Sequence, residues 1–345
     1  MKLASQCRDC AISLRSSAPA ATAGALVWCS VLLLVATLAS SNANAQQYPS
    51  RTITIIAATT PGSLPDVLAR GVGQRLSQKW KQTVVVENRA GGAYALAASA
   101  VTNTPADGYT LLATESGFYT TQPHLSKGKP AYAQKDFVVV SGMASIPMAF
   151  VAHPSLEAKS IRELVELAKA RPGAINYGTA GPGTAPHMGM LLFESMANIK
   201  LTAVHYRGIS LAVNDLIAGH INVLAIGPTV ALPAFKAGKV KILGVGSARA
   251  VPQLEGVAPV AEAVPGFELA VSFSLLARAG TPDEVVSKIN ADVQEIVRDA
   301  QFQTQFLNPQ ALQPMLGSPG EIKKQLDAES DRWRRLIQEA NLTVD

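Results

Sequence analysis

The chain has 345 residues, of which 48% are hydrophobic and 16% are charged, and it contains 26 Gly and 21 Pro. This length suggests two domains with sizeable cores, and the composition excludes an intrinsically disordered chain. The formal net charge of +5 falls to +3 without residues 1–45, which hold three basic residues and one acidic residue. A charge this balanced argues against a nucleic-acid groove, so we expect no nucleic-acid partner.

The first 45 residues have the organisation of a secretory signal peptide. Basic residues up to Arg15 precede an apolar run over residues 25–39, and small residues follow as far as Ala43-Asn44-Ala45. An apolar run of about 15 residues is short for a membrane-spanning helix, which needs about 20, so an uncleaved anchor is the weaker alternative. We expect cleavage near Ala45 and export to the periplasm.

All three cysteines, Cys7, Cys10 and Cys29, lie in this segment. The mature chain is therefore expected to have no disulfide, no thiolate nucleophile and no cysteine metal site. A chain of about 300 residues buries a core that is large enough to fold without disulfides.

Short apolar strands alternate with helices in the next hundred residues. A β-branched run comes first, and apolar residues at four-residue spacing follow it. This order predicts parallel βαβ units with sheets that are buried on both faces. Strands are expected at 53–59, 83–88 and 109–114, and helices at 68–80 and 94–103.

A second series begins near residue 137 and has the same alternation. Thr281 is expected to be the N-cap of a late helix, with Pro282 at the first helical position. Strands are expected at 137–140, 148–152, 175–177, 201–206, 223–226, 241–245 and 272–276, and helices at 160–170, 184–197, 209–218, 282–299 and 319–340.

The two halves share one turn pattern. The chain reads Pro61-Gly62-Ser63-Leu64-Pro65-Asp66 after the first strand, and Gly181-Pro182-Gly183-Thr184-Ala185-Pro186-His187 after a strand of the second half. Each is a glycine turn, then Ser or Thr, one residue, Pro and a polar residue that opens an amphipathic helix. Ser63 and Thr184 are expected N-caps, and Asp66 is expected to complete a capping box with Ser63.

Two ordinary capped helices would explain this pattern, because N-caps are common. The glycines favour a second interpretation, since glycine lets a ligand approach the backbone and unpaired N–H groups at helix starts bind anions. Each helix start stabilises a negative group by about 0.3–1 kcal/mol. Two of them facing one crevice from opposite domains would hold a carboxylate without an arginine.

The motifs of common enzyme classes are missing from the sequence. It contains no phosphate loop, no nucleophile elbow and no complete dinucleotide fingerprint, and its five histidines show no metal spacing. We therefore expect neither a metal nor an organic cofactor. A secreted hydrolase of small acids is the rival from the enzyme class, and the missing motifs argue against it.

Several short motifs follow one another in a fixed order over residues 48–345. They are Tyr48–Ile53 with Pro61-Gly62, Asp66–Arg70, Val86–Arg89 with Gly91-Gly92, Ala106–Leu112, Asn176–Gly181, Tyr206–Gly208 and Ala279–Pro282. Together they resemble the motifs of Bug-type (tripartite tricarboxylate transporter) extracytoplasmic solute receptors. The resemblance covers essentially the whole mature chain.

The resemblance implies a two-domain α/β fold of the periplasmic-binding-protein (Venus flytrap) type. Each domain would be a mainly parallel sheet flanked by helices, and the chain would cross between the domains twice. Residues 46–147 and 271–345 would form domain 1, and residues 148–270 would form domain 2. The protein would act as a monomeric receptor that closes on a small carboxylate and delivers it to membrane transporter subunits, or presents it to a sensor kinase ectodomain.

In this family the ligand's carboxylate is held by the loop after the first strand and by the corresponding loop of domain 2. Strand ends complete the wall of the site. Carried over to this sequence, the resemblance implies that the ligand is bound by Thr60, Pro61, Gly62, Ser63, Leu64, Asp66, Thr114, Glu115, Ser116, Thr179, Ala180, Gly181, Gly183, Thr184, His187, Tyr206, Arg207, Gly208, Gly227 and Thr229.

Two departures from the family pattern bear on the ligand. Pro61-Gly62-Ser63 stands where many relatives have Pro-Gly-Gly, which stiffens the loop and adds a hydroxyl. Gly227-Pro228-Thr229 stands where many have an Asp-Asn pair, whose acid is the natural partner of an amino acid's ammonium group. We therefore expect a non-amino carboxylate, with Glu115 as the residue that could take over the missing acid's role.

Overall fold

The computed structural model describes residues 48–125, 131–247, 251–340 and 342, and residues 49–345 group into one unit. The expected signal peptide, residues 1–45, lies outside the described residues. Within the described ranges, no helix has both the length and the apolar character to cross a membrane.

Six strands form the first sheet, in the order β11-β4-β10-β3-β1-β2. β1 pairs in parallel with β2 and β3, as the βαβ pattern predicts, whereas β10 runs antiparallel to β3 and β4. The sheet is therefore mixed, because β10 returns to it from the second sheet and not through a helical crossover. The strands are β1 (Ile53–Ala57), β2 (Val84–Asn88), β3 (Thr110–Glu115), β4 (Phe137–Pro147), β10 (Ala270–Arg278) and β11 (Gln313–Pro314).

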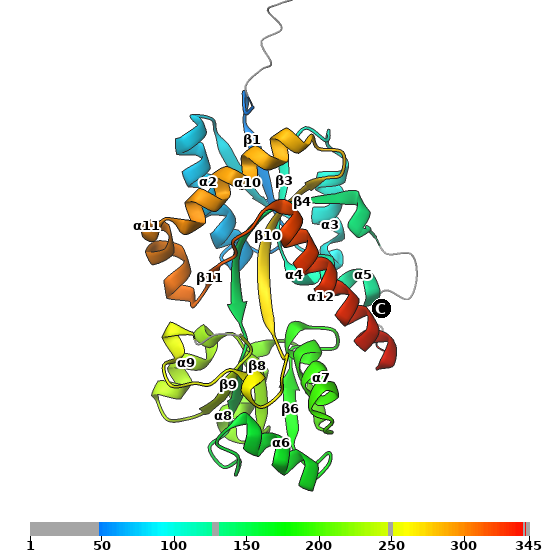
Figure 1. The fold of residues 1–345 in the computed structure, drawn as a ribbon, viewed down its shortest axis with the longest axis vertical. Coiled ribbons are helices and arrows are strands. Elements are labelled where there is room, and N and C mark those ends of the chain that lie inside the picture. Colours follow the sequence, from blue (N-terminus) through cyan, green and yellow to red (C-terminus); the bar gives the residue numbers. More distant parts are fainter. Residues whose placement is uncertain (1–47, 126–130, 248–250, 341, 343–345) are drawn as a thin grey trace, which may run out of the picture. The chain divides into compact units, whose positions relative to one another are not determined.

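Helices cover both faces of the first sheet (Figure 1). The alternation of side chains along β1 explains this arrangement. Ile55 lies near Gly73 of α2, whereas Ile56 packs in a cluster with Val101 of α3 and Leu326 of α12. Neighbouring residues of a strand point to opposite faces, so each face buries an apolar row. The helices of this first lobe are α2 (Leu64–Trp80), α3 (Ala95–Thr102), α4 (Ser116–Thr120), α5 (Gln122–Leu125), α10 (Asp283–Arg298), α11 (Ala300–Phe302) and α12 (Pro319–Glu339).

Five strands form the second sheet, in the order β7-β6-β8-β5-β9. β6 is parallel to β7 and β8, whereas β5 is antiparallel to β8 and β9, so this sheet is mixed as well. β5 follows β4 after the single residue Met148, and it enters the second sheet without a crossover helix. The strands are β5 (Ala149–Ala152), β6 (Asn176–Thr179), β7 (Thr202–His205), β8 (Val223–Ile226) and β9 (Lys241–Val245).

The second lobe repeats the two-faced core of the first. Phe150 packs in a cluster with Leu164 of α6 and Phe193 of α7, whereas its neighbour Val151 packs with Leu216 of α8 and Ala231 of α9. The four helices of this second lobe are α6 (Ile161–Ala170), α7 (Ala185–Ala197), α8 (Ile209–Ala218) and α9 (Pro228–Lys236).

The end of α12 joins the core of the second lobe. Trp333, Leu336 and Ile337 are buried in the same apolar cluster as Met188 and Phe193 of α7. The two lobes are therefore connected by the passage from β4 to β5, by the return from β9 to β10, and by this apolar contact.

The predicted N-cap at Thr281 is wrong. α10 begins at Asp283 with Pro282 in the N-cap position, and the Thr281 hydroxyl donates to the carbonyl oxygen of Arg278 at 2.7 Å. The hydroxyl is thus turned toward the preceding turn, and α10 has no side-chain cap. Helices α4, α5, α9 and α11 were not expected from the sequence.

Candidate functional site

The two turns that the sequence singles out have the same structure. We call residues 60–66 the first turn and residues 181–187 the second turn. Gly62 and Gly183 both have positive φ, +82° and +75°. The Ser63 hydroxyl donates to the carbonyl oxygen of Thr60 at 2.8 Å, and the Thr184 hydroxyl donates to that of Gly181 at 2.7 Å. One local structure is thus built twice, once in each lobe.

The helix starts in these turns differ from the prediction. Ser63 and Thr184 are the N-cap residues of α2 and α7, as predicted, but neither side chain makes a capping hydrogen bond. Asp66 Oδ2 accepts the Gly62 amide at 2.8 Å, so the predicted capping box with Ser63 is wrong. In the second turn His187 Nδ1 accepts the Gly183 amide at 3.0 Å. Both hydroxyls bind back to their own turn, and the residue four positions after each glycine takes its amide.

Asp66 is held inside the first lobe. Its side chain is buried, and Oδ1 accepts Arg70 Nε at 3.0 Å and Asn88 Nδ2 at 2.8 Å. Burial by itself would raise the pKa of Asp66, but the hydrogen bonds from Arg70, Gly62 and Asn88 outweigh it and hold this pKa below its usual value. Asp66 is therefore an ionised support that fixes the first turn.

His187 has the equivalent place in the second turn, but it is neutral. Its side chain is buried and lies edge-on to His205, with 4.8 Å between ring centroids. Burial, with a smaller contribution from His205, lowers the pKa of His187 to about 4. Because Nδ1 accepts the Gly183 amide, the proton of the neutral ring lies on Nε2.

The free amides lie two residues after the glycines, at the first position of each helix. The Gly62 and Gly183 amides donate to Asp66 and His187, so they are not open to a ligand. In the described part of the chain, no acceptor is found for the amides of Leu64 and Ala185, the first residues of α2 and α7. Leu64 and Ala185 are each followed by a proline, which has no backbone N–H group. Each turn therefore offers one free N–H group next to a position without one.

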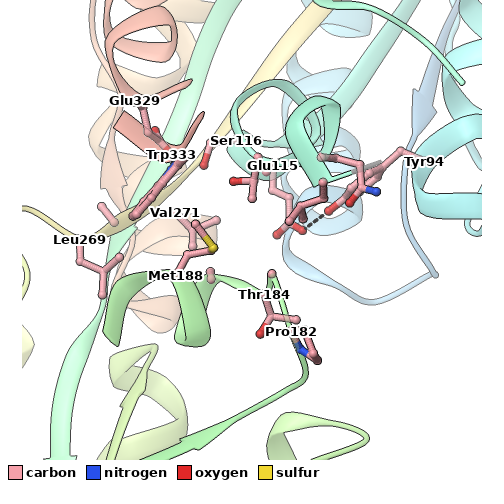
Figure 2. A pocket seen from close by; sticks show the side chains of 17 residues that line it. Tyr94, Glu115, Ser116, Pro182, Thr184, Met188, Leu269, Val271, Glu329 and Trp333 are labelled. Carbon is pink, nitrogen blue, oxygen red and sulfur yellow. Dashed lines mark hydrogen bonds between the residues drawn. The ribbon is translucent and has the colours of Figure 1, made fainter. Parts of the chain in front are cut away.

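A cavity of about 210 Å³ lies between the lobes. Its wall combines Glu115, Ser116 and Trp333 of the first lobe with Thr184 and Met188 of the second, and their side chains surround one space in Figure 2. We call it the interlobe cavity. The cavity is smaller than the pockets that bind drug-sized molecules, which measure roughly 300–1,000 Å³. Its size fits a small metabolite.

Two larger hollows adjoin this cavity. The first-turn hollow, about 560 Å³, is lined by Thr60, Ser63 and Leu64, and it shares Tyr94 and Glu115 with the cavity. The α12 hollow, about 500 Å³, includes Arg332 and shares Glu329 and Ala270 with the cavity. The cavity thus shares one glutamate with each hollow.

The predicted site residues fall into three groups. Glu115, Ser116, Gly183 and Thr184 line the interlobe cavity, and Thr60, Ser63 and Leu64 line the first-turn hollow, together with Glu115. The others line none of these spaces, namely Pro61, Gly62, Asp66, Thr114, Thr179, Ala180, Gly181, His187, Tyr206, Arg207, Gly208, Gly227 and Thr229.

Some residues of the third group have other partners. Tyr206 donates its hydroxyl to Asp215 Oδ2 at 2.6 Å, and Gly227 is the N-cap of α9. Thr179 Oγ1 lies 2.8 Å from His205 Nδ1 and accepts the Gly181 amide at 3.1 Å, so it supports the second turn from behind.

The chain is similar in sequence to a known family of proteins. Residues 68–342 match the model of the tripartite tricarboxylate transporter family receptor. The chain belongs to this family. A relative from a Pseudomonas species, the UPF0065 protein in the tcbD-tcbE intergenic region, is 32% identical over 89% of this chain and 93% of its own.

Two solved structures show what such receptors look like with a ligand. The structure of R. palustris Rpa4515 with adipate is 31% identical, covers 86% of this chain and 99% of its own, and has a TM-score of 0.70. MatC from Rhodopseudomonas palustris with bound malate is 25% identical, covers 84% and 100%, and has a TM-score of 0.66. The predicted family and the two-domain α/β fold of a periplasmic binding protein are therefore confirmed, with mixed sheets in which most strands run in one direction.

This receptor's cavity also contains residues that the sequence analysis missed. Tyr94 donates its hydroxyl to Glu115 Oε1 at 2.5 Å. Glu329 Oε1 accepts Trp333 Nε1 at 2.9 Å and Thr120 Oγ1 at 3.1 Å, and burial raises the pKa of Glu329. Glu329 and Trp333 are one helical turn apart on α12, and no local sequence signal places them at a cavity.

The lining of the cavity restricts its chemistry. Among the described residues, no lysine, arginine or histidine lines the interlobe cavity, and no cluster of ligating side chains suits a metal ion. Hydroxyl groups, the backbone at the start of α7 and two glutamates are available for recognition. The receptor can therefore hold a small polar molecule by hydrogen bonds.

Proposed function

We propose that this receptor binds one small carboxylate between its lobes and delivers it to the membrane subunits of a tripartite tricarboxylate-type transporter. One observation carries the proposal: the same helix-starting turn is built in both lobes, and each copy presents a free amide to a cavity or hollow. Family membership supports it, as do solved structures of similar proteins with adipate and with bound malate.

The acid group is held without a cationic side chain. N–H groups at a helix start carry partial positive charge, and each start favours a carboxylate by about 0.3–1 kcal/mol. The amides of Leu64 and Ala185 are the proposed contacts. Asp66 and His187 hold the turns in shape and do not touch the ligand.

Closure of the lobes completes the mechanism. We propose domain boundaries at residues 147/148 and 270/271, so that the two chain passages act as hinges. A ligand that contacts both turns gains more binding free energy in the closed form than in the open one, and it therefore shifts the population toward closure. The closed form is the one that a partner in the membrane recognises. The protein acts in the periplasm and returns its ligand chemically unchanged.

Calorimetric titration of the mature protein tests this function. We expect small carboxylic acids to bind and their neutral primary amides not to bind, because the amides lack the charge that the helix starts favour. Thr184→Leu should weaken binding by 100-fold or more and change the free energy of unfolding by less than about 2 kcal/mol, the scale of a lost helix cap.

Ser160→Ala is the matched control. Ser160 accepts the Glu163 amide as the N-cap of α6, away from the cavity. Its loss should cost about 1 kcal/mol of stability and leave the affinity unchanged within about twofold. Equal affinity for acids and amides, or an unchanged affinity in Thr184→Leu, contradicts the proposed function.

A further inference from the structure

Glu115 lies where it can contact one end of the ligand, the end opposite the ligand's own acid group. It is the last residue of β3 and the N-cap position of α4, yet its carboxylate makes no capping hydrogen bond. The carboxylate instead turns to Tyr94 and lines the interlobe cavity (Figure 2). Within the described ranges, Glu115 Oε2 has no hydrogen-bond partner, so one oxygen remains for a ligand.

Tyr94 fixes this carboxylate. Ala93 and Tyr94 both have positive φ, +47° and +71°, a conformation that costs a non-glycine residue free energy and persists where the surrounding structure imposes it. Burial, and then the neighbouring Glu115, raise the pKa of Tyr94, so its hydroxyl keeps the proton that it donates. The Glu115 carboxylate is thus held in one position before a ligand arrives.

The two walls of the cavity have opposite electrostatic character. The start of α7, with Gly183, Thr184 and Ala185, carries the partial positive charge of a helix N-terminus. Glu115 lines the first-lobe side, and none of the described residues around the cavity is basic. A second carboxylate on the ligand would meet Glu115 without a cation to compensate it, whereas an ammonium group would form a charge-assisted hydrogen bond.

We propose that Glu115 makes this receptor selective for a small carboxylate with a cationic far end, an amino or otherwise zwitterionic acid, over dicarboxylates. The proposal rests on the proposed function and specifies its ligand class. It replaces our expectation of a non-amino ligand.

Three acids with a similar chain and different far ends test the proposal: adipate, 5-aminopentanoate and hexanoate. A panel with one methylene fewer, glutarate, 4-aminobutanoate and pentanoate, covers the effect of length. We expect the amino acid of each panel to bind about 10- to 100-fold more tightly than the diacid, with the neutral-ended acid in between. Glu115→Gln should reduce the difference between amino acid and diacid to less than about threefold.

Glu166→Gln is the matched control, because it removes the same charge from an exposed position on α6. This substitution should leave the affinity for the amino acid and the affinity for the diacid unchanged. Tyr94→Phe keeps the charge but removes the hydrogen bond that holds it, and it should weaken amino-acid binding by about fivefold or more.

The outcomes separate this proposal from the proposed function. If a diacid binds more tightly than its amino counterpart, or if Glu115→Gln leaves their ratio unchanged, the selectivity proposal is wrong while carboxylate binding stands. If none of these acids, nor any other small carboxylic acid, binds at all, the proposed function fails and the selectivity fails with it.

Discussion

His187 has the place in the second turn that Asp66 has in the first, and each accepts the amide of the turn glycine. The two side chains respond differently to pH. Because the pKa of His187 falls from 6.5 in the unfolded chain to about 4 in the folded one, the unfolded chain binds more protons between these values. The contribution of neutral His187 to the free energy of unfolding is complete above about pH 6.5 and is lost as the pH falls toward 4.

His187→Asn tests this at the residue scale. Asparagine keeps a hydrogen-bond acceptor near the Gly183 amide and cannot titrate. We expect the wild type to lose about 3 kcal/mol more of its free energy of unfolding than the variant between pH 7 and pH 4, measured by urea unfolding. Parallel pH profiles would show that His187 is not the titrating group.

Sequence reasoning identified both turns but misjudged their hydrogen bonds. Ser63 and Thr184 were correctly placed at the helix starts, because the residue types and the prolines specify that position. The choice between Ser63 accepting an amide and donating to Thr60 depends on side-chain torsions, which the residue order does not determine.

At the scale of elements, the first turn requires a glycine at position 62, because the backbone there has a left-handed conformation. Gly62 has a φ of +82°, and an added methyl group there would have no heavy atom within 4 Å. Gly256 is similar, with a φ of +78° and the same open space. Gly62→Ala and Gly256→Ala should each lose about 1–2 kcal/mol of stability, because alanine is strained in this region.

Binding distinguishes the two variants. Gly62 sets the geometry of a turn that lines the first-turn hollow, whereas Gly256 lies away from all three spaces. Calorimetry should therefore show weaker ligand binding in Gly62→Ala only. A similar loss of affinity in Gly256→Ala would assign the effect to general destabilisation.

Most elements could be predicted from apolar periodicity, and the exceptions have physical reasons. β8 and β9 match their predicted bounds, since each is a short apolar run between turn signals. α9 was missed because Pro228 and Pro233 resemble breaks, although Pro228 starts the helix and Pro233 is accommodated within it. The direction of β10 could not be predicted, since periodicity carries no information on strand direction.

At the scale of the whole molecule, α12 belongs to both lobes. Leu326 is buried in the core of the first lobe, whereas Ile337, three turns later, is buried with α7 of the second. No local pattern predicts this, because the stripe of α12 is continuous and the helices α4 and α7, which it contacts, are more than a hundred residues away in the chain. Glu329 and Trp333 line the cavity because they lie on this same helix, and they were missed for the same reason.

A matched pair of truncations tests the role of this contact. Leu326→Ala and Ile337→Ala should each lower the free energy of unfolding by about 2–4 kcal/mol, the usual cost of such a change in a core. The radius of gyration of the ligand-free protein, measured by small-angle X-ray scattering, should increase in Ile337→Ala only. An increase in both variants would contradict the assignment of Ile337 to the contact between lobes.

The glutamates shared between the interlobe cavity and its neighbouring hollows affect how fast a ligand is captured. A solute that approaches through the first-turn hollow passes Glu115, and one that approaches through the α12 hollow passes Glu329. On the Glu115 side the negative potential slows a dianion on its way in, and added salt relieves this by screening. The α12 hollow differs, because it contains Arg332 and because burial raises the pKa of Glu329. Discrimination against doubly charged solutes thus begins during diffusion, before either lobe has moved.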